Sequence, residues 1–150
     1  MAQDDKSDAR RVIARAWQDA GFKSLLLRDP RAALEDLNIE VPDHLSLSVY
    51  DNSGSTHHMV ICTPCSCYPS FIGAAPGYWK DPDYKTAITQ NPAAWLEGMG
   101  TKLAQDENLK VVDTDVNSRA FVIPKQPEGK ITEEATAQAV TATSLVGHTR

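Results

Sequence analysis

Apolar residues in the first third of the chain follow a helical spacing. Over residues 8–20 they recur three and four positions apart, with arginines and aspartates between them, which predicts an amphipathic helix. Shorter helices are expected over residues 22–27 and 31–37. Asp29 and Pro30 precede the last of these and supply an N-cap and a proline suited to a first helical turn.

Further along, the spacing of apolar residues changes to alternation, which is typical of half-buried strands. Strands are expected over residues 45–50, 57–61, 109–112 and 119–123. Helices are expected over residues 84–89 and 93–104, and from the capping residue Thr132 to about residue 142.

Short polar segments, 51–55 and 113–118, separate the members of each strand pair, so both pairs are expected to form hairpins. This order of elements predicts an α+β fold of antiparallel strand pairs flanked by helices. Residues 1–9 are expected to be a flexible N-terminus, and residues 10–150 to form a single domain.

Composition narrows the possible functions. A net charge of −5 with no cluster of basic residues argues against a nucleic-acid-binding protein. No segment has the length and apolarity of a membrane span. The polar, acidic N-terminus does not resemble a signal peptide, so we expect a cytoplasmic location.

All three cysteines lie in the segment Cys62-Thr63-Pro64-Cys65-Ser66-Cys67. Such close spacing cannot close long loops with disulfides, but it gathers soft thiolate ligands for a transition metal. A structural zinc site would need a fourth ligand, for which His57 or His58 is available nearby. An iron–sulfur cluster held by four cysteines is excluded within one chain. A third possibility is that backbone amides between Cys65 and Cys67 lose their protons and join the sulfurs as ligands.

The cysteine segment resembles the metal-claw motif of nitrile hydratase alpha subunits, usually C-[S/T]-L-C-S-C. Stretches similar to that family lie in the same order on both sides. They are Ala14-Arg15-Ala16-Trp17 with Phe22-Lys23, His57-His58-Met59-Val60-Ile61, Tyr68-Pro69, Pro76-Gly77-Tyr78-Trp79-Lys80, Arg119-Ala120-Phe121-Val122-Ile123-Pro124 and Ser144-Leu145-Val146-Gly147. The chain departs from the family pattern at Pro64, where leucine is usual, and at Ser70, where tryptophan is common.

The resemblance implies an alpha-subunit-like domain whose claw, residues 62–67, holds one metal ion. Cys62 would be an unmodified axial thiolate, Cys65 a sulfinic acid and Cys67 a sulfenic acid. Ser66 and Cys67 would add deprotonated backbone nitrogens. Thr63 marks cobalt forms in this family and serine marks iron forms, so low-spin Co(III) is expected and Fe(III) is the alternative.

The implied reaction is the hydration of a nitrile to an amide at this Lewis-acid centre. The catalytic residues would be Cys67, whose sulfenate acts as nucleophile or base, together with Cys65 and Ser66. The resemblance also implies a beta-type partner that supplies arginines to the oxidised sulfurs, and a cobalt metallochaperone. The alternatives are a thiocyanate hydrolase-type subunit, a non-catalytic relative of nitrile hydratase and a plain zinc module.

Some residues outside the claw have two interpretations. Tyr68 is either a core aromatic residue or a hydroxyl group that serves the metal site. Arg119 is either a solvated strand residue or a structural arginine. His57 and His58 are interpreted as ordinary strand residues, and a role as metal ligands is the less favoured alternative.

Overall fold

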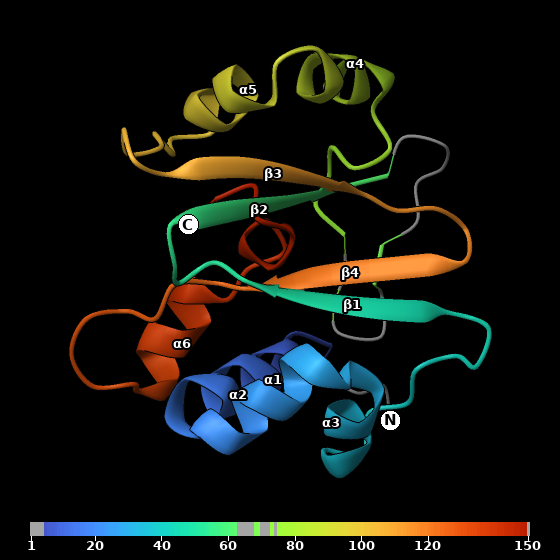
Figure 1. The fold of residues 1–150 in the computed structure, drawn as a ribbon, viewed down its shortest axis with the longest axis vertical. Helices are drawn as coiled ribbons and strands as arrows, with labels where there is room; N and C mark the ends of the chain where they lie inside the picture. The colour runs from blue at the N-terminus through green and yellow to red at the C-terminus, as the bar shows by residue number, and fades with distance from the viewer. Residues whose placement is uncertain (1–4, 63–67, 70–72, 74, 150) are drawn as a thin grey trace.

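The computed structural model describes residues 5–62, 68, 69, 73 and 75–149. Its elements lie in three layers (Figure 1). The N-terminal helices form one outer layer, two pairs of strands lie in the middle, and a second group of helices covers the opposite side. None of the described helices is both long and apolar enough to cross a bilayer.

The first layer consists of α1 (Asp5–Gln18), α2 (Ala20–Arg28) and α3 (Pro30–Asp36). Asp19 is extended and accepts a hydrogen bond from the backbone N–H of Phe22 at 3.0 Å, which separates α1 from α2. Asp29 caps α3 in the same way, as predicted. The segment 1–9, expected to be flexible, overlaps α1 from residue 5 onward.

The strands are β1 (Ser46–Asp51), β2 (Thr56–Ile61), β3 (Asn108–Asp113) and β4 (Ser118–Ile123). β1 pairs with β4 and β2 pairs with β3, both in parallel. The predicted antiparallel hairpins are therefore wrong. The predicted mixture of helices and strands is present.

Asn52 explains why β1 and β2 do not fold back on each other. Its side-chain oxygen accepts the backbone N–H of His58 at 2.8 Å, and its amide nitrogen donates to the His58 carbonyl at 3.0 Å. The backbone groups of His58 are thus bonded to a side chain and not to β1. Four consecutive buried residues, 120–123, end β4, which is the burial typical of a parallel strand covered on both faces.

The second group of helices is α4 (Pro82–Gln90) and α5 (Pro92–Gly98), capped by Asp81 and Asn91. α5 ends earlier than predicted, because Gly100 takes a left-handed φ of 98° and the Thr101 N–H bonds back to the Leu96 carbonyl. α6 (Glu133–Ala139) begins at the predicted cap, Thr132. A short 3-10 turn, η1 (Ser144–Val146), follows it.

β4 lies between two hydrophobic cores. Phe121 and Ile123 face the core shared with the N-terminal helices. Ala120 and Val122 face the other core, which contains Cys62. The alternation of side chains along one strand thus joins both halves of the domain.

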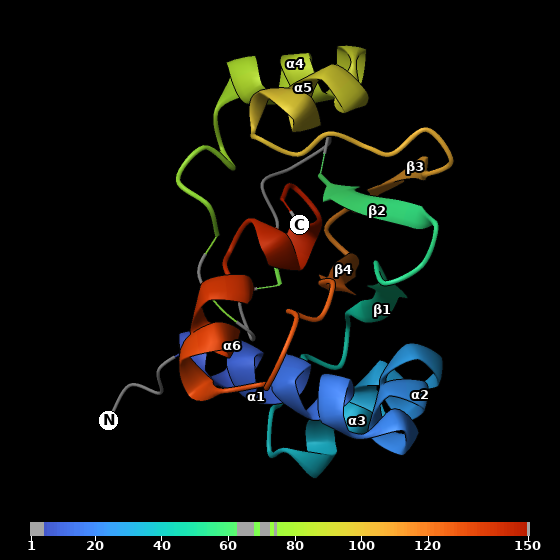
Figure 2. The same ribbon diagram turned by 90° about the vertical axis from the view of Figure 1, so that its left-hand side faces the viewer.

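The C-terminal turn, residues 144–148, lies against β2 and β4 (Figure 2). Gly147 has φ 72°, and a Cβ atom there would lie 1.9 Å from the carbonyl oxygen of His58. The Gly147 carbonyl accepts a hydrogen bond from His57 Nε2 at 2.7 Å, and His148 Nε2 donates to the Val60 carbonyl at 2.8 Å. The turn therefore contacts the strand that leads to Cys62 through backbone as well as side chains.

Gly147→Ala should destabilise the chain by about 3 kcal/mol, because it combines left-handed strain with a backbone collision. Urea unfolding of the purified chain measures this loss. Gly98→Ala is the matched control, since a Cβ at Gly98 meets no atom within 4 Å, and it should leave stability unchanged or slightly raised. Equal midpoints for both variants would show that the close contact is absent in solution.

Candidate metal centre

Of the predicted metal ligands, Cys62 lies within the described residues. It follows β2 directly and is 3% exposed, in the core beneath α4 and α5. Thr63, Cys65, Ser66 and Cys67 lie outside the described residues, so their ligand and catalytic roles remain predictions.

His57 and His58 serve the fold at the other end of β2. His57 is buried and bonded to the Gly147 carbonyl. His58 Nδ1 donates to Asn52 Oδ1 at 2.8 Å, and its ring stacks on Tyr50 with centroids 5.0 Å apart. Burial lowers the pKa of His58, which keeps its imidazole neutral.

Strand geometry separates these histidines from the cysteine. At about 3.3 Å per residue, four residues of strand place the backbone of His58 about 13 Å from that of Cys62. One zinc ion holds its ligand atoms at about 2.0–2.3 Å, so it is too small to join the two side chains across this distance. In the described part of the chain, no three His, Cys, Asp or Glu side chains form a metal-ligand group. These observations argue against a zinc site built from Cys62 and either histidine.

An aromatic cluster packs in the same core as Cys62. It comprises Tyr68, Tyr78, Trp79, Tyr84, Trp95 and His148, drawn from the segment after the claw, from α4 and α5, and from the C-terminal turn. Trp79 is 2% exposed and His148 is fully buried, so the cluster excludes water from one side of the cysteine. A thiolate in such surroundings is stabilised by a bound cation rather than by solvent.

His148 has a defined tautomer in this cluster. Its Nε2 donates to the Val60 carbonyl, so Nδ1 is free of hydrogen and accepts from the Tyr78 hydroxyl at 2.7 Å. Burial lowers the pKa of His148 to about 4, and the ring stays neutral. His148 thereby bridges the aromatic cluster to β2, two residues before Cys62.

Tyr68 and Arg119 have structural roles. Tyr68 is buried, packs edge-on against Trp79, and donates its hydroxyl to the Ala142 carbonyl at 3.2 Å. Arg119 is half-buried and donates to the carbonyls of Asp115 and Ser118, which closes the connection into β4. Tyr68 is thus a core aromatic residue, and Arg119 is a structural arginine.

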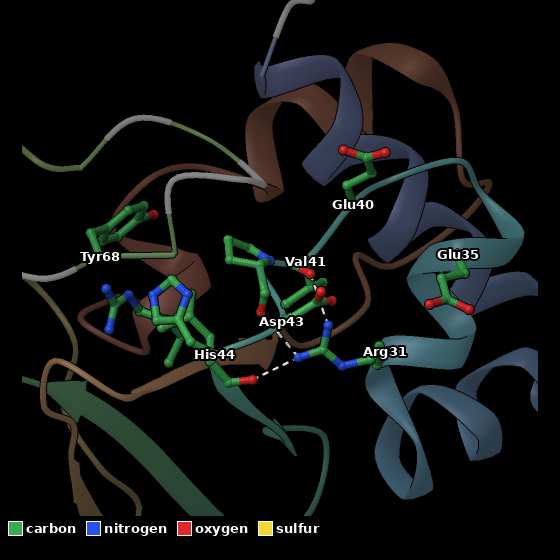
Figure 3. Close-up of a pocket in the computed structure, with 10 residues that line it drawn as sticks. Arg31, Glu35, Glu40, Val41, Asp43, His44 and Tyr68 are labelled. Carbon is green, nitrogen blue, oxygen red and sulfur yellow. Dashed lines mark hydrogen bonds between the residues drawn. The ribbon is translucent and has the colours of Figure 1, made fainter.

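A groove of about 730 Å³ ends at Tyr68, the first described residue after the claw (Figure 3). The Arg31 guanidinium forms part of its wall by donating to the carbonyls of Val41, Pro42 and Leu45. His44 and Arg119 also line the groove. His44 lies across it from Glu35 of α3 and Glu40 of the following loop (Figure 3). Tyr68, which follows the claw in the sequence, therefore borders an open groove.

Tyr84 and His148 were not identified as site residues from the sequence. Tyr84 was assigned only to a helix, and His148 lay just beyond the last recognised stretch. A buried position for either residue depends on packing between distant segments, which single-sequence periodicity does not report.

Comparison with known proteins defines the class. The family model described as nitrile hydratase, alpha chain, matches residues 2–149. The chain belongs to this family.

Individual relatives include both nitrile hydratase and thiocyanate hydrolase subunits. The chain is 34% identical over 140 residues to the low-molecular weight cobalt-containing nitrile hydratase subunit alpha of Rhodococcus rhodochrous, covering 91% of this chain and 68% of that one. It is 30% identical over 153 residues to the thiocyanate hydrolase subunit gamma of Thiobacillus thioparus, covering 93% and 63%.

Solved structures show the same two kinds of relative. A double mutant of the Fe-type nitrile hydratase from Comamonas testosteroni Ni1 matches with a TM-score of 0.85 and 30% identity, over 94% of this chain and 70% of that one. A thiocyanate hydrolase mutant matches with a TM-score of 0.84 and 30% identity, over 95% and 72%. The mixed helix and strand fold is therefore that of the family.

Acid should weaken the fold through His148. The unfolded chain binds a proton there below about pH 6.5, whereas the folded chain does so only near pH 4, so stability is lost as pH falls through this window. The contribution at pH 4 is about 3 kcal/mol. Urea midpoints between pH 7 and pH 4 should therefore fall more steeply for the wild type than for His148→Gln, which remains neutral. Parallel pH profiles would contradict the assignment.

Proposed function

We propose that this chain is the metal-binding subunit of a nitrile hydratase, which adds water to a nitrile to give the amide. One observation carries the proposal: Cys62 is buried at the end of β2, immediately before Cys65, Ser66 and Cys67, in a chain of the nitrile hydratase alpha family. A buried soft ligand beside two more thiols suits a thiophilic transition metal.

The surroundings of Cys62 fit such an ion. The hydrophobic residues packed in its core are aliphatic or aromatic, and the buried Thr114 hydroxyl nearby donates to the Ile61 carbonyl. A hard cation such as Mg²⁺ would require oxygen ligands rather than thiolates. Tyr84 adds a buried hydroxyl without a described hydrogen-bond partner. We assign Cys62, Cys65, Ser66 and Cys67 as the metal ligands. The three cysteines would contribute their sulfurs, and Ser66 and Cys67 would contribute backbone nitrogens.

We infer that the metal is low-spin Co(III). Thr63 and the cobalt-containing relatives from Rhodococcus rhodochrous and Pseudonocardia thermophila support cobalt. The Fe-type relative from Comamonas testosteroni supports Fe(III) as the alternative. When bound, the trivalent ion supplies Lewis acidity that activates a nitrile toward water.

The chain's own residues supply the remaining chemistry. Cys67, oxidised to a sulfenate, is the nucleophile or the base that takes a proton from the attacking water. Cys65, oxidised to a sulfinate, and Ser66 complete the catalytic group. The aromatic cluster excludes bulk water from the Cys62 side and so strengthens electrostatic interactions within the site.

A partner subunit is part of this proposal. Oxidised cysteine sulfurs are buried anions and need cationic hydrogen-bond donors, which the aliphatic and aromatic side chains packed with Cys62 do not supply. A beta-type subunit would supply arginines, and a metallochaperone would load the cobalt. The groove beside Tyr68 is an open surface near the claw on which such a partner could bind.

A thiocyanate hydrolase-type subunit is the second candidate function. The relative from Thiobacillus thioparus matches 93% of this chain, at an identity close to that of the nitrile hydratases. Both activities would use the same claw. Amide formation from a nitrile, measured against carbonyl sulfide release from thiocyanate by the same reconstituted complex, distinguishes them.

Metal analysis combined with intact mass tests the nature of the site. The loaded chain should contain cobalt and about three added oxygen atoms, two for a sulfinic acid and one for a sulfenic acid. His58→Asn is the control and should retain the metal, because the His58 ring is hydrogen-bonded to Asn52. Zinc without added oxygen, lost in the histidine variant, would show a structural zinc module instead.

Replacing Cys62, Cys65 or Cys67 singly by serine should abolish hydration in the assembled complex, because each variant removes one sulfur ligand. Size-exclusion chromatography checks that the variant still assembles with its partner, and product formation from a nitrile measures the activity. Undiminished turnover in any one of the three variants would contradict the proposed ligand set.

A further inference from the structure

The Tyr84 hydroxyl is a buried polar group without a described hydrogen-bond partner. Its ring lies among Tyr78, Trp95 and Trp79, with centroids 4.8, 5.3 and 6.1 Å away. Most buried side-chain polar atoms in proteins are paired, so an exception calls for a physical explanation.

The other two tyrosines of the aromatic cluster are paired. Tyr68 donates to the Ala142 carbonyl, and Tyr78 donates to Nδ1 of His148. Tyr84 is buried to the same extent as Tyr68 but, unlike Tyr68 and Tyr78, has no described hydrogen bond from its hydroxyl. Its phenol oxygen could have been omitted, as in phenylalanine, without loss of a described bond.

The Cys62 sulfur is the group in this core that metal binding would charge. Tyr84 and Cys62 lie in the same buried core. Burial, followed by the charges of Tyr78 and the Cys62 thiolate, raises the pKa of Tyr84, so the phenol keeps its proton and remains a donor. A neutral thiol is a weak acceptor, whereas a thiolate is a strong one, and metal binding converts the first into the second.

We propose that Tyr84 is a positioning residue of the metal centre, donating a hydrogen bond to the Cys62 sulfur once that sulfur is a metal-bound thiolate. This inference rests on the proposed metal-binding function and adds to it a residue from outside the claw. A hydrogen bond to a ligating atom fixes its orientation and tunes its basicity, and the loss of such a bond weakens metal binding.

The proposal predicts that removal of the Tyr84 hydroxyl has opposite effects on the metal-free and the metal-loaded protein. In the metal-free chain the hydroxyl is buried and unpaired, so its removal costs no bond and relieves desolvation. In the loaded protein the same hydroxyl holds a ligand. Tyr78 provides the contrast, because its bond to His148 exists without metal.

Tyr84→Phe tests this, with Tyr78→Phe as the matched control. Thermal unfolding is measured on the metal-free chain. Cobalt release to a chelator and the sulfur-to-cobalt charge-transfer band are measured on the loaded complex. For Tyr84→Phe we expect an unchanged or higher metal-free midpoint, cobalt release about tenfold faster, and a displaced band. Tyr78→Phe should lower the metal-free midpoint.

Two results would overturn the role of Tyr84 while leaving the metal site intact. One is wild-type release kinetics and an unmoved band in Tyr84→Phe. The other is a metal-free midpoint lowered as far as in Tyr78→Phe, which would reveal an existing protein partner. Failure of the wild-type complex to retain cobalt would instead refute the proposed function, and the Tyr84 role with it.

Discussion

The contact between the backbones of Gly147 and His58 is the constraint on which the arrangement of the second core depends. No side chain fits between them, so the C-terminal turn lies directly against β2. His57 and His148 bond to backbone carbonyls on either side of this contact and fix its register. Cys62 directly follows β2, so a contact far away in sequence helps to determine where this proposed ligand lies.

β4 connects the core that contains this contact to the rest of the domain. Its side chains enter both cores, and its backbone pairs with β1 in parallel. The aromatic cluster closes the second core around a neutral histidine and buried tyrosines. Such a region disfavours isolated charge, so a thiolate at Cys62 calls for a cation close by. The proposed metal chemistry is therefore linked to folding at this residue.

Features encoded by neighbouring residues could be predicted from the sequence. Asp29 and Thr132 cap helices where the local pattern places them, and the alternation over residues 57–61 marks a real strand. The cysteine spacing is likewise local, and with its flanks it identified the family that the comparisons show. The roles of Cys65, Ser66 and Cys67 stay predictions.

Strand partners and the surroundings of Cys62 could not be predicted in this way. Alternation indicates that a strand is half-buried, but it does not say which strand lies beside it. The polar segment 51–55 favoured a hairpin, whereas the backbone of His58 bonds to the Asn52 side chain and not to β1. Tyr84 and His148 come within reach of β2 only through packing of segments that are far apart in the chain.

X-ray absorption at the cobalt and sulfur edges of the loaded complex tests the central claim most directly. The account predicts a cobalt shell of three sulfurs with main-chain nitrogen neighbours, and a sulfur spectrum containing thiolate, sulfenate and sulfinate together. A shell that includes imidazole, or a sulfur spectrum of unmodified thiolates alone, would contradict it.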